Sequence, residues 1–145
     1  MGFISIAINS RRERMFISNV YIYPHATTEK INLLESKIKN KGNQIILGDF
    51  NAHCKKWSKS TETKRGKLIE DMIKRNKLVI VNNKKIATMC KGRAKTLGTP
   101  DLILAKLKET QTITSFSTSK NQYIYSGFTI NKSPVTHTFR NCCYI

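Results

Sequence analysis

A carboxylate and a carboxamide stand two positions apart directly after an apolar run. The apolar residues 45–47 end in Gly48, and Asp49 and Asn51 follow. Residues two apart in a strand project to the same side, so these polar groups are expected together where the strand surfaces. A carboxylate there can orient water or hold a divalent cation, and a carboxamide can donate to a phosphate oxygen, which suits phosphodiester hydrolysis. The same residues also suit an Asx turn that closes the strand with no chemistry.

The elements that must position these groups begin with a predicted hairpin. Residues 3–9 and 15–23 are rich in β-formers and flank a polar turn. Pro24 stops the second strand, and Thr27 or Thr28 can cap a helix whose apolar residues recur at helical spacing up to residue 38. Residues 44–48 then return as a strand.

The second half of the chain continues the alternation of helix and strand. Leu68, Ile69, Met72 and Ile73 lie on one face of a predicted helix, and short apolar strands are expected within 77–83 and over 101–105. Residues 110–145 show no clear period, although 121–130 are compatible with a strand or hairpin. Strands that alternate with helices predict an α/β fold, or an α+β layered one.

The charge of the chain favours a polyanionic partner. Its 145 residues hold 26 Lys+Arg against 9 Asp+Glu, a formal net charge of +17. Nucleic acid is the commonest polyanion that such a surface attracts. No apolar run approaches the roughly 18 residues of a membrane span, and the basic residues near the N-terminus follow an apolar stretch, the reverse of a secretory signal. We therefore expect no membrane insertion and a nuclear or cytoplasmic location.

The four cysteines lack the pairing of a zinc site. Cys142 and Cys143 are adjacent, and Cys54 and Cys90 lie far from them and from each other. Reduced thiols are therefore expected.

The central motif resembles a known family. GDFNAH at 48–53, followed by Trp57, by Arg65-Gly66 at the start of a helix and by Asn82 at the end of a strand, is similar to the core of the endonuclease/exonuclease/phosphatase superfamily. In particular, it resembles the apurinic-type endonuclease domain of non-LTR retrotransposons.

Two further motifs flank this core in the order of that family. VYIYPH resembles its Tyr-x-Pro-Pro segment, with Tyr21 kept and Tyr23 in place of the first Pro. GTPDLILA matches its Ser/Thr-x-x-Asp-Leu strand at Asp101. The resemblance covers roughly residues 1–130 and implies a partial αββα sandwich that lacks its N-terminal strands, with residues 131–145 as an irregular tail.

The resemblance also implies roles for particular residues. Asp49 would orient the attacking water and serve as a metal ligand, Asn51 would bind the scissile phosphate, and Tyr21 would support the phosphate or leaving group. Asp101 would orient a catalytic histidine, while Mg²⁺ neutralises developing charge.

The basic and aromatic residues around that motif have further implied roles. Lys55, Lys56 and Arg65 would contact DNA, although Arg65 can equally cap its own loop. Trp57 is expected to be a packed aromatic side chain that anchors the loop, and His53 to lie at the surface or beside the site.

The chain departs from the family pattern in two places. The family closes its site with Ser-Asp-His, whereas this chain keeps Ser126 but has Gly127 and Phe128 next. A substitute role for His137 would need a rearranged strand end. The strands that carry the metal-binding Glu are not matched, and Glu13, in a basic turn, is a poor substitute.

These departures predict a truncated, degenerate endonuclease-like domain whose ancestral activity is Mg²⁺-dependent DNA cleavage and whose own turnover is weak or absent. A non-catalytic basic module that binds nucleic acid is the alternative. A phosphatase of the same superfamily fits the Gly-Asp-x-Asn motif but not the Arg-Gly helix and the position of Trp57.

Overall fold

Strand-forming residues on both sides of a polar segment build the predicted hairpin. In the computed structural model, β1 (Gly2–Asn9) pairs antiparallel with β2 (Arg14–Tyr21) along its whole length. The structure describes residues 1–9, 11, 13–58, 62–82, 89–91, 96–107, 112–118, 124–132 and 135–143, with side chains up to residue 82 and over 99–107. The hairpin forms one side of a five-stranded sheet.

The sheet has the order β1-β2-β3-β7-β4. Helix α1 (Thr28–Ile38) connects β2 to β3 (Asn43–Asp49), and this crossover makes β2 and β3 parallel. Helix α2 (Lys64–Arg75) leads to β4 (Val79–Ile80), and β7 (Asp101–Lys106) lies antiparallel between β3 and β4. β5 (Met89–Lys91) and β6 (Thr96–Gly98) form a separate pair.

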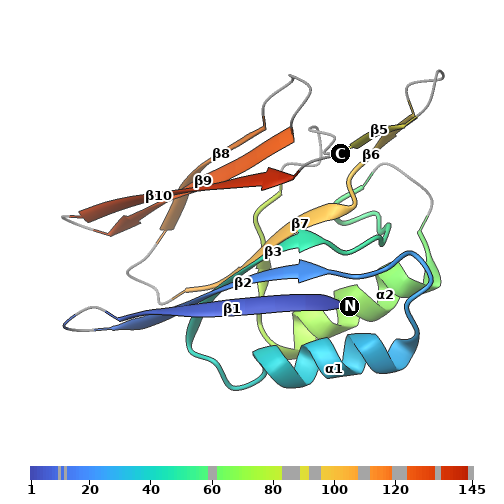
Figure 1. Ribbon diagram of the computed structural model, residues 1–145, viewed down its shortest axis with the longest axis horizontal. Coiled ribbons are helices and arrows are strands. Elements are labelled where there is room, and N and C mark those ends of the chain that lie inside the picture. The colour runs from blue at the N-terminus through green and yellow to red at the C-terminus, as the bar shows by residue number, and fades with distance from the viewer. Residues whose placement is uncertain are drawn as a thin grey trace.

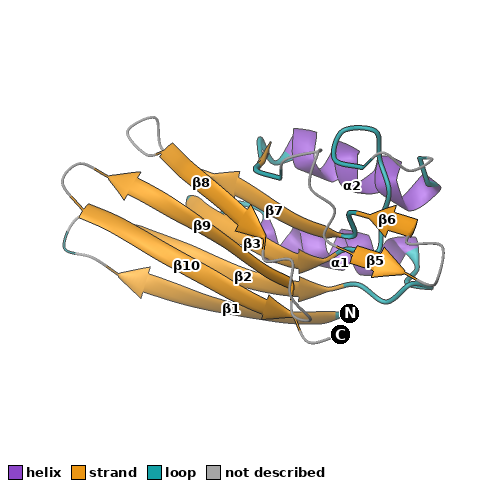
Figure 2. Cartoon of the chain, turned by 90° about the horizontal axis from the view of Figure 1, so that it is seen from above, coloured by secondary structure: helices purple, strands orange, loops and turns teal. Residues whose placement is uncertain are grey.

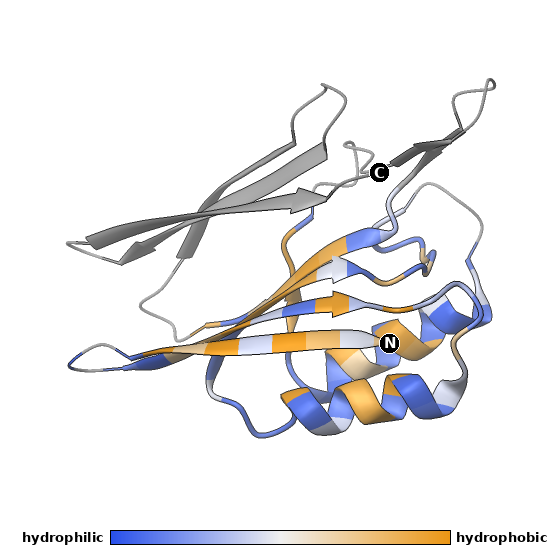
Figure 3. Cartoon of the chain, in the orientation of Figure 1, coloured by the Kyte–Doolittle hydropathy of each residue, from blue (hydrophilic) through white to orange (hydrophobic). Residues whose placement is uncertain are grey.

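Both helices bury their apolar faces against one side of the sheet, as the spacing predicts (Figures 1 and 3). Thr27 is the N-cap residue of α1, and Thr63 caps α2 through its Oγ1, which accepts from the backbone N–H of Gly66. The core on this side includes Ile31, Leu34 and Ile38 of α1, Ile69, Met72 and Ile73 of α2, and Val20, Ile46, Leu102 and Leu104 of the sheet. Burial of this apolar surface is the main force that holds the helices to the sheet.

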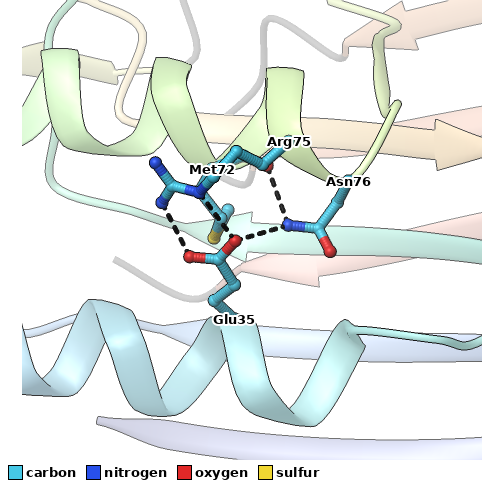
Figure 4. Close-up of polar contacts among 4 residues, drawn as sticks. All are labelled: Glu35, Met72, Arg75 and Asn76. Atoms are coloured by element: carbon cyan, nitrogen blue, oxygen red, sulfur yellow. Dashed lines mark hydrogen bonds and ion pairs between the residues drawn. The ribbon is translucent and has the colours of Figure 1, made fainter.

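The two helices are also joined by a polar contact. The Arg75 guanidinium donates to Glu35 at 3.0 and 2.7 Å, and Asn76 Nδ2 donates to the same carboxylate and to the Met72 carbonyl (Figure 4). The Arg75 hydrogen bond is the main cause that lowers the pKa of Glu35. Because the Arg75 side chain is exposed, this ion pair orients the helices more than it stabilises them.

A three-stranded sheet lies on the other side, opposite the helices (Figures 1 and 2). It has the order β10-β9-β8, formed by β8 (Thr112–Thr118), β9 (Ile124–Lys132) and β10 (Val135–Cys143). A second apolar cluster, Ile45, Leu47, Ile103 and Ala105, occupies the face of the five-stranded sheet that is turned away from the helices. The layers confirm the predicted fold class, a partial α/β sandwich.

The last segment differs from the expectation of an irregular tail. The sequence predicts no regular structure after residue 130, whereas β10 pairs antiparallel with β9 from Val135 opposite Lys132 to Cys143 opposite Ile124. The strand pairing of two neighbouring segments imposes an order that the weak period of either one does not indicate.

The described helices are all too short or too polar to cross a membrane.

Candidate active site

Three of the predicted site residues form one row across the ends of neighbouring strands. Tyr21 is opposite Asp49 in the β2–β3 pair, and Asp49 is opposite Asp101 in the β3–β7 pair. β2 and β3 end at this row and β7 begins at it. In each strand, alternation places these positions on the same side as the second apolar cluster, away from the helices. Strand pairing therefore brings together residues that are 80 positions apart in the sequence.

Asp49 and Asn51 form a local turn. The backbone N–H of Asn51 donates to Asp49 Oδ1 at 2.8 Å, and Asn51 Nδ2 donates to the carbonyl of Ile22 at 3.0 Å. Asn51 has a φ of 44°, so it is left-handed rather than extended, and the period-two argument from the sequence does not apply to it. The Asx turn that the residue types allow is present, and the Asn51 side chain joins it to Ile22, the residue after β2.

Gly48 allows β3 to approach β2 closely at this point. It has a φ of 143°, and a Cβ built there would lie 1.9 Å from the carbonyl oxygen of Val20. Only glycine combines this backbone conformation with so close a neighbour. The glycine of the central motif is therefore required by the strand packing that carries Asp49.

The environment of Asp49 weakens its acidity. Burial raises the pKa of the carboxyl above its usual value, while hydrogen bonds from Asn51 and the charge of His53 act in the opposite direction. Burial dominates, so the ionised form is less well solvated than a surface carboxylate. Because its pKa is raised, the ionised Asp49 carboxylate is a stronger proton acceptor than a surface carboxylate. A cation bound nearby would stabilise that ionised form.

Arg65 ties the loops of the site together. Its Nη1 donates to the Asn51 carbonyl at 2.9 Å, and its Nη2 donates to the carbonyls of Ala26, at 3.0 Å, and of Pro24. The guanidinium therefore joins the start of α2 to the loop after β2 and to the turn after β3. The loop contacts that the sequence allows for Arg65 are present, and its contact with DNA stays a prediction.

The Arg-Gly motif has a second structural reason. A Cβ on Gly66 would lie 1.8 Å from the carbonyl oxygen of His53. The same carbonyl also accepts a hydrogen bond from the backbone N–H of Thr63 at 2.9 Å, which holds the start of α2 against His53. Glycine at position 66 thus lets the first turn of α2 pack against the backbone of the central motif.

The aromatic and basic residues after the motif divide into buried and exposed. Trp57 is fully buried, and its Nε1 donates to the Ala52 carbonyl at 3.0 Å, which confirms its packing role. His53 is half-buried, with an Nδ1 that has no hydrogen-bond partner among the described residues. Lys55 and Lys56 are exposed on the turn before Trp57, where solvent can reach both ammonium groups.

Asn82 holds the start of β7 in place. Its Nδ2 donates to the Asp101 carbonyl at 2.9 Å, and its Oδ1 accepts from the backbone N–H of Ile103 at 2.6 Å. The side-chain amide thereby imitates a strand partner beyond the end of β4. The sequence marks Asn82 only as part of a motif, and its role in supporting Asp101 requires the structure.

Asp49 and Asp101 supply part of the oxygen ligands that a hard divalent cation needs. Asp49 and Asp101 are direct neighbours in an antiparallel pair, and such neighbours lie close enough for their side chains to share a ligand. Two carboxylates and water suit Mg²⁺, which prefers oxygen ligands and keeps several waters. Glu13 precedes β2 at its start, whereas Tyr21 ends that strand, so Glu13 belongs to the opposite end of the sheet.

A second group of ligand atoms lies outside the row. Cys54 Sγ is 3.4 Å from carboxylate oxygens of both Glu62 and Glu70, and the three ligand atoms lie within 4.8 Å of one another. Burial raises the pKa of the Cys54 thiol, and the two carboxylates raise it further. The contact is therefore a protonated thiol that donates to carboxylates, in agreement with the expected reduced cysteine. Sequence spacing does not reveal it, because a loop and a helix supply the two glutamates.

The residues expected to close the site lie in the three-stranded sheet. Ser126, Gly127 and Phe128 belong to β9, which starts at the end of the sandwich where β2 and β3 finish (Figures 1 and 2). β10 runs towards that end and His137 is its third residue, so His137 belongs to the more distant half of the strand. The side chains of these four residues lie outside the described ones.

Comparisons with known proteins bear on the family and the fold of the chain. The sequence model of the endonuclease-reverse transcriptase family matches residues 15–126. Among solved structures, the endonuclease domain of TRAS1, a telomere-specific non-LTR retrotransposon, is similar with a TM-score of 0.71 and 16% identity. That match covers 82% of this chain and 55% of the TRAS1 chain, so the present chain spans about half the length of that domain. A comparison with curated proteins gave no match.

Proposed function

We propose that this chain is a retrotransposon-derived endonuclease domain with weak turnover. The ground is that the chain belongs to the endonuclease-reverse transcriptase family, within the endonuclease/exonuclease/phosphatase superfamily. Its ancestral reaction is the metal-dependent hydrolysis of a DNA phosphodiester. The observation that supports this proposal most is the row of Tyr21, Asp49 and Asp101. These residues are opposite one another in neighbouring strands, so the motif residues meet at one end of the sheet.

Asp49 is the centre of the proposed reaction. Its half-buried carboxylate orients the attacking water and accepts a proton from it, a role that its raised pKa favours. Asn51 is fixed by its bond to the Ile22 carbonyl, and its remaining amide hydrogen is available for a phosphate oxygen. Tyr21 is exposed beside Asp49, where its hydroxyl can donate to the phosphate or the leaving oxygen.

Asp49 and Asp101 would hold the metal ion. A Mg²⁺ ion held by these carboxylates would supply positive charge to stabilise the charge that develops on the phosphate. Asn82 keeps Asp101 in place from behind, through the two hydrogen bonds that fix the start of β7.

Turnover is weak because the acid and imidazole of the family motif are missing. Gly127 and Phe128 stand in their positions and supply neither a charge nor a proton. A positioned general acid or base contributes about 10²–10⁴-fold to a rate, so a loss of at least ~100-fold is expected relative to a complete site.

DNA is the proposed partner. The formal net charge of +17 and the exposed Lys55 and Lys56 favour binding to the phosphate backbone. A nuclear or cytoplasmic location is proposed with it, because DNA of this kind is met there.

Nicking of supercoiled plasmid tests the proposal. The wild-type chain is incubated with Mg²⁺ beside an EDTA blank, an Asp49→Ala variant and an Asp71→Asn variant, in which a carboxylate of α2 outside the row is neutralised. We expect slow nicking that needs Mg²⁺ and Asp49 and is unchanged by Asp71→Asn. Equal nicking by wild type and Asp49→Ala contradicts the hydrolytic role.

The missing acid and imidazole favour one other function, a non-catalytic module that binds nucleic acid through Lys and Arg. Such a module binds DNA with a strong salt dependence, ignores Mg²⁺ and is unaffected by Asp49→Ala. Binding of this kind without any nicking would select the module over the endonuclease.

A further inference from the structure

Two exposed tyrosines stand side by side at the end of β2. The rings of Tyr21 and Tyr23 meet edge to face, with centroids 5.1 Å apart and an angle of 87° between their planes. Tyr21 is 43% exposed and Tyr23 is 53% exposed. The proposed hydrolysis gives Tyr23 no role, and this residue stands where the resemblance would place a proline.

The backbone that carries this pair is fixed on both sides. Ile22, between the two tyrosines, is fully buried, and its backbone N–H donates to the Asp49 carbonyl at 2.8 Å. The carbonyl of Tyr23 accepts from the N–H of Ala26 at 3.0 Å. The Arg65 guanidinium donates to the carbonyls of Pro24 and Ala26, which lie further along the same loop. The tyrosine rings are therefore exposed on a backbone that is already ordered.

The pair lies next to the group proposed to bind phosphate. Asn51 Nδ2 donates to the carbonyl of Ile22, so the Asn51 side chain is hydrogen-bonded to the residue that lies between the two tyrosines. Tyr21 is also the register partner of Asp49. A nucleotide whose phosphate lies at Asn51 therefore has an aromatic surface within reach of its base.

From this juxtaposition we infer that Tyr21 and Tyr23 form a stacking platform for an unpaired DNA base. A base inside a duplex is already stacked on its neighbours, whereas a base in a single strand or a gap offers a free face. Stacking on aromatic side chains accepts any base, and the high positive charge of the chain holds the phosphates nearby. The site thus selects unpaired over paired DNA. The inference rests on the proposed function in that DNA is the ligand.

Binding in EDTA separates the platform from cleavage. Fluorescence anisotropy is measured with one labelled DNA sequence as single strand, as gapped duplex and as intact duplex. The proteins are wild type, Tyr23→Ala, Tyr23→Phe and Leu33→Ala, which removes another exposed apolar side chain from α1. Thermal unfolding of each variant reports whether the fold is intact.

We expect Tyr23→Ala to lose about 10-fold in affinity for single-stranded and gapped DNA, within the range measured for base–aromatic stacking, and to keep its affinity for duplex. Tyr23→Phe retains the ring and should bind like wild type, as should Leu33→Ala. A 2-aminopurine base in the gap should be quenched by wild type and by Tyr23→Phe but not by Tyr23→Ala.

Two results would overturn the platform. One is an equal loss for all three DNA forms, which indicates a general change of charge or fold, and the other is no loss at all. Nicking that depends on Asp49 without any preference for unpaired DNA removes the platform and leaves the proposed function. A preference for unpaired DNA that depends on Tyr23, in a protein that does not nick, removes the hydrolysis and leaves the platform.

Discussion

Replacement of Gly48 by alanine should destabilise the protein far more than replacement of Gly42. At Gly48 the new Cβ would meet the Val20 carbonyl oxygen at 1.9 Å, and it must move away by about 1 Å to reach even the shortest Cβ contact of 3.0 Å. The φ of 143° adds strain of about 1–3 kcal/mol for any residue with a Cβ. If the separation of β2 and β3 also breaks two ladder hydrogen bonds, about 2 kcal/mol more is lost. The expected total is about 3–5 kcal/mol.

Thermal unfolding, followed by the fluorescence of Trp57, measures this difference, because Trp57 is the single tryptophan of the chain and is fully buried. Gly42→Ala is the matched control, because no atom lies within 4 Å of a Cβ built there. We expect Gly48→Ala to lower the melting temperature by about 10 °C and Gly42→Ala to leave it unchanged. Equal stability of the two variants would refute the close approach of β3 to β2.

Three further predictions concern other positions in the chain. Asp49→Asn keeps an acceptor for the Asn51 N–H and removes the charge of a carboxyl whose pKa is raised by burial. The variant protein should therefore melt at a higher temperature than wild type at pH 7. That advantage should shrink as the pH falls through the raised pKa of Asp49 and vanish below the ordinary value of 3.8, because wild type then gains stability by protonation. Ile4, Ile6 and Ile8 are exposed on the edge strand β1, so a second copy of the chain is expected to associate there at high protein concentration. Ile6→Lys places a charge on this edge and should lower the average mass in light scattering; an unchanged mass counts against self-association through this edge. The pair of changes Gly127→Asp and Phe128→His should raise Mg²⁺-dependent plasmid nicking at least ~10-fold if loss of these groups limits turnover, and an unchanged rate argues against that cause.

Regular elements and their apolar faces could be predicted from the sequence. The helical spacing of Ile31, Leu34 and Ile38 and the apolar run before Gly48 each correspond to a buried face in the structure. These patterns are local, because one helix or strand carries the whole signal. Strand β10 lacks such a signal, and its order depends on pairing with β9.

The contacts that organise the site are less local. The left-handed backbone of Asn51 and the strand-like bonds of Asn82 depend on partners 19 to 29 positions away in the sequence. The contact of Cys54 with Glu62 and Glu70 likewise needs the loop and α2 to fold against each other. Residue types and motif order make Asp49, Asp101 and Tyr21 candidates for the site, but strand register is what makes them neighbours.

The rate of plasmid nicking as a function of Mg²⁺ concentration, for wild type and Asp49→Asn together, tests the central claim most directly. The variant retains the acceptor for the Asn51 N–H, but it loses the negative charge and has an NH2 group in place of the second carboxylate oxygen. We predict slow nicking by wild type that saturates with Mg²⁺ and falls at least ~100-fold in the variant. Equal rates for the two proteins at every Mg²⁺ concentration would contradict a hydrolytic centre at Asp49.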